Sequence, residues 1–169
     1  MIILETERLY LREMTVDDAE NFYNLNTDPE VIRYTGDKPF VNIEAARIFL
    51  ENYDQYKKYG FGRWTVNRKS DNEYLGWCGL KYIAEYDEID IGYRFFRKYW
   101  NMGYATESAR PCIDLGFTKF KLKVIVGRAA KANIASIRVL EKIGLRYLKS
   151  YDFHGQEGVV YIIENNSLR

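Results

Sequence analysis

The middle of the chain carries three consecutive segments whose residue types suit extended strands. Phe61 to Asn67, Tyr74 to Ile83 and Glu88 to Phe96 are rich in aromatic and β-branched residues, and turn-forming segments separate them. Short segments of this composition at close spacing are typical of strands joined by hairpins. The sequence therefore predicts a three-stranded antiparallel meander at the centre of the fold.

Helical patterns lie on both sides of the meander. Before it we expect a strand from Arg8 to Glu13, a helix from Val16 to Asn26 capped by Thr15, and a longer helix from Asn42 through Tyr59 that Gly60 ends. After it the expected elements are a helix from Gly103 to Lys119, a strand from Lys123 to Ala129, a helix from Asn133 to Ile143, and strands at Leu145 to Phe153 and Gly158 to Ile163. The sum is one α/β (α+β) domain over residues 1–169, with about seven strands in a mixed sheet and helices on its faces.

Charge balance and cysteine content argue against several classes of protein. The 25 Lys and Arg against 24 Asp and Glu leave a net charge of +1, whereas nucleic-acid binding through bulk charge needs a basic excess. Cys78 and Cys112 form no CxxC pair, so we expect a reducing, cytoplasmic setting. The start of the chain lacks a signal-peptide pattern, and no apolar run approaches the ~20 residues that span a bilayer. The single histidine, His154, excludes a two-histidine metal site, so no metal is expected.

The junction after Phe96 is the first candidate for chemistry. It reads RKYWNMGYATE from Arg97 to Glu107, in which a strand ends, a short loop contains Gly103, and a helix begins. The first N–H groups of a helix have no internal partner and suit a phosphate group. An ordinary strand-to-helix turn explains the same residues, and no Walker A or GxGxxG pattern accompanies them.

Two further segments carry polar residues of interest. On the strand from Glu88 to Arg94, the side chains of Glu88 and Asp90 share one face and could accept a proton from an amine. Alternatively, this face is simply solvated, and Arg94 could pair with Asp90. Asn133 and Ser136 open the next helix and could touch a ligand at the open end of the sheet. Alternatively, Asn133 is only an N-cap and Ser136 is incidental.

Six fragments in a fixed order carry a family resemblance that covers nearly the whole chain. They are ETERLYLREMTVDDAENFYNL, DPEVIRYTG, FGRWTV, YLGWCGL, IDIGYRFFRKYWNMGYATESA and NIASIRVLEKIGLRY. In this order and spacing the chain resembles the GNAT N-acetyltransferase superfamily, in the branch of the ribosomal-protein N-terminal acetyltransferases. The resemblance implies a mostly antiparallel sheet that splays between its fourth and fifth strands, and direct transfer of an acetyl group from acetyl-CoA to an amine.

The resemblance also implies a role for each candidate residue. Backbone N–H groups would hold the pyrophosphate of acetyl-CoA at Asn101, Met102, Gly103, Tyr104, Ala105 and Thr106. The pantetheine arm would run beside Phe95 and Phe96, with an N–H near Phe95 polarising the acetyl carbonyl. Asn133 would contact the arm or hold the splay, and Ser136 would protonate the leaving thiolate. Asp90, or else Glu88, would accept the proton of the amine.

The chain departs from the family pattern at several positions. Trp100 stands where the family loop begins with Gln or Arg, so Arg97 and Lys98 would supply the missing positive charge. Leu140 stands where other family members carry a tyrosine that acts as the general acid, so Ser136 becomes the candidate for that role. These departures leave open a non-catalytic acyl-CoA sensor, or more weakly a nucleotide-binding regulator, on the same fold.

The acceptor amine is the least constrained part of the prediction. Family members acetylate protein N-termini and small-molecule amines, and Tyr34, Trp64 and Trp77 are candidates to line the acceptor pocket, although large aromatic side chains are more often core residues. The acidic stretch from Glu85 to Glu88 could attract a cationic amine, or could be a charged loop. Fifteen tyrosines suit a contact surface, so a monomer and a homodimer both fit.

Overall fold

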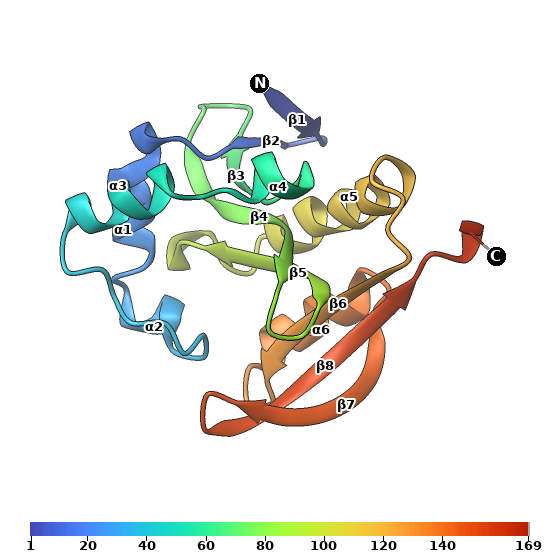
Figure 1. The fold of residues 1–169 in the computed structure, drawn as a ribbon. Coiled ribbons are helices and arrows are strands. Elements are labelled where there is room, and N and C mark those ends of the chain that lie inside the picture. Colours follow the sequence, from blue (N-terminus) through green and yellow to red (C-terminus); the bar gives the residue numbers. More distant parts are fainter. Residues whose placement is uncertain (169) are drawn as a thin grey trace.

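One eight-stranded sheet organises the protein, in the strand order β1-β2-β3-β4-β5-β6-β8-β7 (Figure 1). The computed structural model describes residues 1–168. The strands are β1 (Ile2–Glu5), β2 (Leu9–Glu13), β3 (Arg63–Arg68), β4 (Tyr74–Ile83), β5 (Glu88–Phe95), β6 (Val124–Ala130), β7 (Arg146–Phe153) and β8 (Gln156–Glu164). The α-helices are α1 (Ala19–Leu25), α2 (Pro29–Ile32), α3 (Ile43–Glu51), α4 (Gln55–Tyr59), α5 (Tyr104–Thr118) and α6 (Ile134–Lys142). The mixed α/β architecture and the central antiparallel meander are both confirmed.

The sheet opens between β5 and β6. Every other neighbouring pair of strands is antiparallel, whereas β5 and β6 are parallel and are paired at Asp90 and Val126 alone among residues 1–168. Beyond that pair the strands continue to Phe95 and Ala130 without a shared ladder. The splay expected between these strands is therefore present, and it leaves their carboxyl ends apart.

Helices cover both faces of the sheet. Side chains along each strand alternate between the two faces, so each face carries apolar side chains that a helix can bury. On one face, Cys78 and Leu80 of β4 pack with Cys112 and Ile113 of α5 in the main core. On the other face, Trp77 of β4 packs against a smaller cluster of α1 and α3 residues. Figure 1 shows α1, α2 and α3 gathered together, away from α5 and α6.

The sequence missed one strand and misjudged two helices. β1 is absent from the expected set, since four residues with glutamate at the end carry little periodic signal. The helix expected from Asn42 to Tyr59 is broken into α3 and α4 around Asn52 and Asp54, whose side chains favour helix ends. The helix expected from Val16 begins as a 3-10 turn before α1. By contrast, α5 continues through Pro111 without interruption.

Candidate functional site

The connection from β5 to α5 forms a concave stretch of backbone. A 3-10 turn (Arg97–Tyr99) follows β5, and then Asn101 and Gly103 adopt positive φ angles of 62° and 80° before α5 begins. The first N–H groups of α5 have no acceptor inside the helix, and the helix dipole gives them partial positive charge. Residues 101–106 thus present N–H groups of the kind that can bind a phosphate group.

Arg8 braces this loop from β2's side of the sheet. Its Nη2 donates to the Met102 carbonyl at 3.0 Å, its Nε donates to Glu107 Oε2 at 2.7 Å, and its guanidinium lies 4.4 Å from the centre of the Tyr104 ring. The sequence offered no signal for this role beyond the alternation of charges around Leu9. Arg8 therefore fixes the loop, and its charge is paired with that of Glu107.

The Glu107 carboxylate joins the first turn of α5 to the start of the chain. Its Oε1 accepts from Thr6 Oγ1 at 2.6 Å and from the Arg8 N–H at 2.9 Å. Burial raises the pKa of this carboxyl, but the hydrogen bonds from Thr6 and Arg8 outweigh burial and leave its pKa below the usual range. The charged form of Glu107 therefore stabilises the loop.

The two charges expected to replace the missing loop residue are engaged elsewhere. Arg97 pairs with Asp28 at 3.0 Å, and Lys98 lies 3.8 Å from Glu73. Trp100 turns back toward β5, where its Nε1 donates to the Phe95 carbonyl at 2.9 Å, while the N–H of Phe96 donates to the Leu75 carbonyl at 3.0 Å. The loop thus offers backbone N–H groups, and neither Arg97 nor Lys98 is an unpaired cation beside it.

Ser136 lies in the first turn of α6. The Asn133 side chain accepts the Ser136 N–H at 3.3 Å, so Asn133 is an N-cap of α6. Tyr93 of β5 reaches across to the same turn: its hydroxyl donates to the Ser136 carbonyl at 2.7 Å and lies 3.1 Å from Ser136 Oγ. Burial raises the pKa of Tyr93, which keeps its hydroxyl protonated at neutral pH. The sequence analysis missed Tyr93 because its position within a core face gave no polar signal.

Both candidate bases are paired with arginines. Asp90 Oδ1 lies 2.7 Å from Arg63 Nη2, and Glu88 Oε2 lies 2.6 Å from Arg128 Nη2. The Arg63 side chain crosses β4 to reach Asp90, and a Cβ added to Gly92 would come within 2.6 Å of its Nη2 atom. Gly92 therefore provides the space in which this ion pair forms.

The expected pairing of Arg94 with Asp90 is wrong. Two residues four apart on a strand lie ~13 Å apart, so each finds a nearer partner across the sheet or from the helical face. Arg94 instead pairs with Asp37 at 2.8 Å and donates to the side chain of Asn26.

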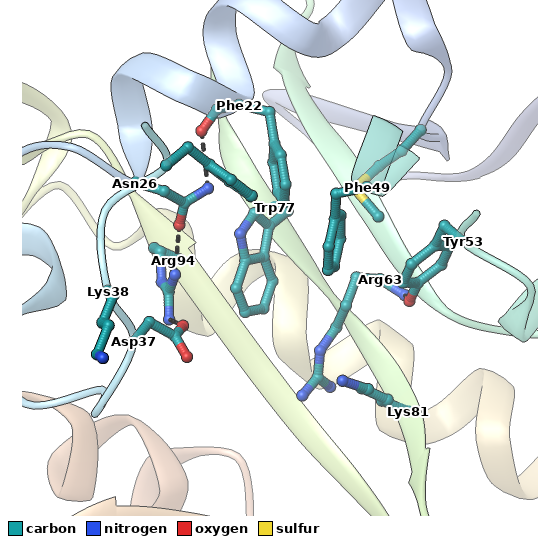
Figure 2. Close-up of a pocket in the computed structure, with 12 residues that line it drawn as sticks. Phe22, Asn26, Asp37, Lys38, Phe49, Tyr53, Arg63, Trp77, Lys81 and Arg94 are labelled. Carbon is teal, nitrogen blue, oxygen red and sulfur yellow. Dashed lines mark hydrogen bonds and ion pairs between the residues drawn. The ribbon is translucent and has the colours of Figure 1, made fainter. Parts of the chain in front are cut away.

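A cavity of about 350 Å³ lies between the α1 and α3 helices and the face of β3, β4 and β5 that carries Trp77 (Figure 2). Phe22, Phe40 and Phe49 form its apolar wall. The Trp77 ring has the guanidinium of Arg63 and that of Arg94 each 5.2 Å from its centre. The cavity therefore has an aromatic wall and a cationic floor.

Lys81 contributes a further charge to this floor. Burial lowers the pKa of its ammonium and the neighbouring Arg63 lowers it further, whereas Asp90 and Asp37 raise it. Its position beside the Arg63 guanidinium is visible in Figure 2.

Of the three aromatic residues expected at the acceptor, Trp77 alone lines this cavity. Trp64 is 1% exposed and pairs in register with Cys78, so it points to the α5 face and belongs to the main core. Tyr34 is half-buried, lies under the Arg33 guanidinium and is not part of the cavity wall. The expectation for Trp64 fails because its strand position places it on the opposite face from Trp77.

The acidic stretch from Glu85 to Glu88 does not line the cavity either. Glu88 is taken up by Arg128, and Asp87 accepts a hydrogen bond from the Tyr82 hydroxyl at 2.7 Å. The charged residues that do line the cavity are mainly basic, contrary to the acidic acceptor site that the stretch suggested.

The segment that closes the cavity is held by the last hairpin of the chain. A Cβ on Gly36 would overlap the His154 ring, which sits at the turn between β7 and β8. Gly36 is therefore required for the close approach of these two segments, and its neighbours Asp37 and Lys38 reach the cavity.

Within residues 1–168, no cluster of three or more His, Cys, Asp or Glu side chains could hold a metal ion. In the same part of the chain, none of the helices has the length and apolarity needed to cross a bilayer.

Comparison with known proteins agrees with this arrangement. Residues 8–146 match the family model described as an acetyltransferase (GNAT) domain. The chain is 37% identical over 154 residues to the uncharacterized protein YkkB of Bacillus subtilis, covering 87% of each chain. It is 32% identical over 148 residues to the uncharacterized N-acetyltransferase p20 of Bacillus licheniformis, covering 86% of this chain and 83% of that one. The crystal structure of a GNAT-family acetyltransferase from Bacillus anthracis superposes with a TM-score of 0.82 at 28% identity, covering 98% of this chain and 99% of that one.

Proposed function

The chain belongs to the GNAT acetyltransferase family and is an N-acetyltransferase, and from this premise we propose that it moves the acetyl group of acetyl-CoA directly onto a primary amine while both substrates are bound. The amine belongs to a small molecule or to a protein N-terminus. The sequence motifs further support kinship with the ribosomal-protein N-terminal acetyltransferase branch. The unbonded thiols of Cys78 and Cys112 support a cytoplasmic location.

One observation carries the proposal: the cavity and the concave loop meet at the end of β5. Arg94 lines the cavity, Phe95 follows it, and the chain then leads directly into the loop that ends at Gly103. An amine in the cavity and a diphosphate on the loop would thus approach the same point from opposite sides of the sheet. The missing ladder between β5 and β6 leaves backbone groups there for the arm that joins them.

Acetyl-CoA supplies the acetyl group as a thioester, which an amine can attack only in its neutral form. An alkylammonium has a pKa near ~10.4, so a group near the cavity must take its proton. We assign this role to Asp90, with Glu88 as the alternative. Neither carboxylate lines the cavity itself, and Asp90 is linked to it through its partner Arg63. Because each carboxylate has an arginine partner, a water molecule would carry the proton between the amine and the carboxylate.

The reaction forms a C–N bond and breaks the C–S bond of the thioester, and the leaving thiolate then needs a proton. Ser136 Oγ is the proposed donor, and the Tyr93 hydroxyl 3.1 Å away would orient it. A backbone N–H near Phe95 would polarise the carbonyl oxygen. Each of these roles belongs to the proposal.

Thermal unfolding with acetyl-CoA, CoA, ATP and NAD side by side tests the cofactor. Ligand at 100 times its dissociation constant adds ~2.7 kcal/mol to stability. For a chain of this length we expect the Tm to rise by roughly 5–10 °C with acetyl-CoA and CoA, but not with ATP or NAD. A larger rise with ATP or NAD, or none with CoA, would contradict the proposal. Binding of acetyl-CoA without transfer to any amine of a broad panel would indicate a non-catalytic acyl-CoA module instead.

A further inference from the structure

The cationic residues of the cavity outnumber the acidic groups that face them. Arg63 is matched by Asp90, and Arg94 is matched by Asp37. Lys38 and Lys81 also line the cavity, and within residues 1–168 neither ammonium makes a hydrogen bond or an ion pair of its own. Asp37 and Asp90 act on Lys81 only as neighbours, since each is already paired with an arginine. Four cationic side chains therefore share two carboxylates around one small space.

Lys81 is the more informative of the two lysines because its ammonium is partly removed from water. It is half-buried on β4 beside the Arg63 guanidinium, and both burial and that arginine disfavour its charge. An unpaired ammonium in such a place is costly, and an anion bound beside it would offset the cost.

A second, independent observation is an unsatisfied hydrogen-bond donor in the wall of the cavity. The Trp77 indole nitrogen is buried and has no partner within the described residues 1–168. Buried polar groups are almost always hydrogen-bonded, and an indole N–H can only donate. Figure 2 shows the Trp77 ring between Arg94 and Arg63, so donors and cations gather on one side of the cavity.

The opposite wall has a different chemistry. The rings of Phe22 and Phe49 stack with their centres 5.4 Å apart, and Phe40 packs against both. A ligand that fills the cavity thus meets cations and donors at one end and aromatic side chains at the other.

From these contacts we infer that the acetyl acceptor is a small amine that also carries a carboxylate and an apolar side chain, as an apolar amino acid does. The carboxylate lies against Lys81 and the arginines on either side of Trp77, and the side chain packs on the phenylalanines. A polycationic amine is disfavoured, because like charges in a partly desolvated site repel. This inference rests on the proposed acetyl transfer and names its acceptor.

Matched pairs of acceptors isolate the contribution of the carboxylate. L-phenylalanine is compared with phenethylamine and L-leucine with isopentylamine, since the members of each pair differ only by that group, and spermidine represents the polycations. We expect kcat/KM at least 10-fold higher for the amino acid of each pair, and the lowest value for spermidine. Lys81→Met keeps the length of the side chain without its charge and should reduce the preference to below 3-fold. Lys57→Met makes the same chemical change on exposed α4, outside the cavity, and should leave the preference intact.

A binding measurement separates this inference from the proposed function. With CoA present, titration calorimetry compares N-acetyl-L-phenylalanine with N-acetylphenethylamine, which requires no turnover. Tighter binding of the carboxylated product to the unmodified chain, lost in Lys81→Met, supports the anion site even where no amine is acetylated. Equal binding of the two products, or faster acetylation of the amines lacking a carboxylate or of spermidine, overturns the inference while leaving acetyl transfer intact. Preference for a phosphate-bearing amine such as phosphoethanolamine over both amino acids also overturns it.

Discussion

Gly76 provides a sharp test of whether the end of β5 is the reacting centre. Its φ of 153° disfavours any side chain, and a Cβ there would come within 2.8 Å of Phe95 Cα and 2.9 Å of the Arg94 carbonyl carbon, with the Arg94 oxygen closer still. These atoms are backbone and cannot rotate away, so Gly76→Ala must push β5 away from β4. Backbone strain and overpacking together should cost about 3 kcal/mol, which corresponds to a fall in Tm of roughly 6–12 °C.

The same displacement falls at the end of β5, between the cavity and the loop that precedes α5. A misplacement of about 1 Å at a reacting centre can cost about 100-fold in rate, so kcat for Gly76→Ala should fall by that order. The rate of CoA release under saturating substrates measures it, with circular dichroism and Tm confirming that the variant is folded.

Gly60→Ala is the matched control for Gly76→Ala. Gly60 also has a positive φ, 82°, but its Cβ would meet only the Phe120 ring at an ordinary 3.6 Å. We expect a loss of about 1 kcal/mol, a fall in Tm of roughly 2–4 °C, and unchanged kcat. If Gly76→Ala keeps kcat within 3-fold of the unmodified chain, the end of β5 is not where the acetyl group is transferred.

Three further predictions follow from other contacts. Ser136→Ala should lower kcat by about 100-fold and change the KM for acetyl-CoA little, because it removes a proton donor and not a binding group. Tyr93→Phe should lower kcat by a smaller factor. An unchanged kcat in Ser136→Ala would remove Ser136 from the mechanism. Glu107→Gln should lower Tm at pH 7. Because the pKa of Glu107 is depressed in the folded state, the difference in Tm from the unmodified chain should shrink as the pH falls from the ordinary pKa of ~4.3 through the lower folded-state pKa. A difference in Tm that does not depend on pH would exclude the charged hydrogen bonds as its source. Burial and the neighbouring Cys78 raise the pKa of Cys112, and both thiols are buried. A thiol reagent at pH 7.5 should therefore label neither cysteine until urea unfolds the chain. Rapid labelling of the folded protein would show that this part of the core opens.

Local patterns predicted much of the fold, because short segments carry their own signals. The meander, the N-cap at Asn133 and the ends of α4 and α6 follow from alternation, capping residues and glycine. The break between α3 and α4 was not predicted, because Asn52 and Asp54 only favour a helix end and tertiary contacts complete it. The Tyr53 hydroxyl accepts the Arg63 N–H, and the Tyr56 hydroxyl donates to the Arg63 carbonyl.

The candidate site was less predictable, since its key contacts join distant strands. Arg63, Lys81 and Arg8 are ordinary charged strand residues in the sequence. Only the register of β3, β4 and β5 shows that Gly92 leaves the space in which Arg63 reaches Asp90. The face on which Trp64 or Trp77 lies likewise depends on pairing that no single strand encodes.

The contact between Gly36 and His154 couples two distant parts of the sequence at one wall of the cavity. Gly36, Asp37 and Lys38 precede β3, whereas His154 lies in the turn of the last hairpin, whose strand β8 pairs with β6. Because a side chain on Gly36 would overlap the His154 ring, the position of the hairpin and the positions of Asp37 and Lys38 depend on each other. A substitution in the turn between β7 and β8 is therefore expected to act on the cavity and to leave the Met102 carbonyl bonded to Arg8.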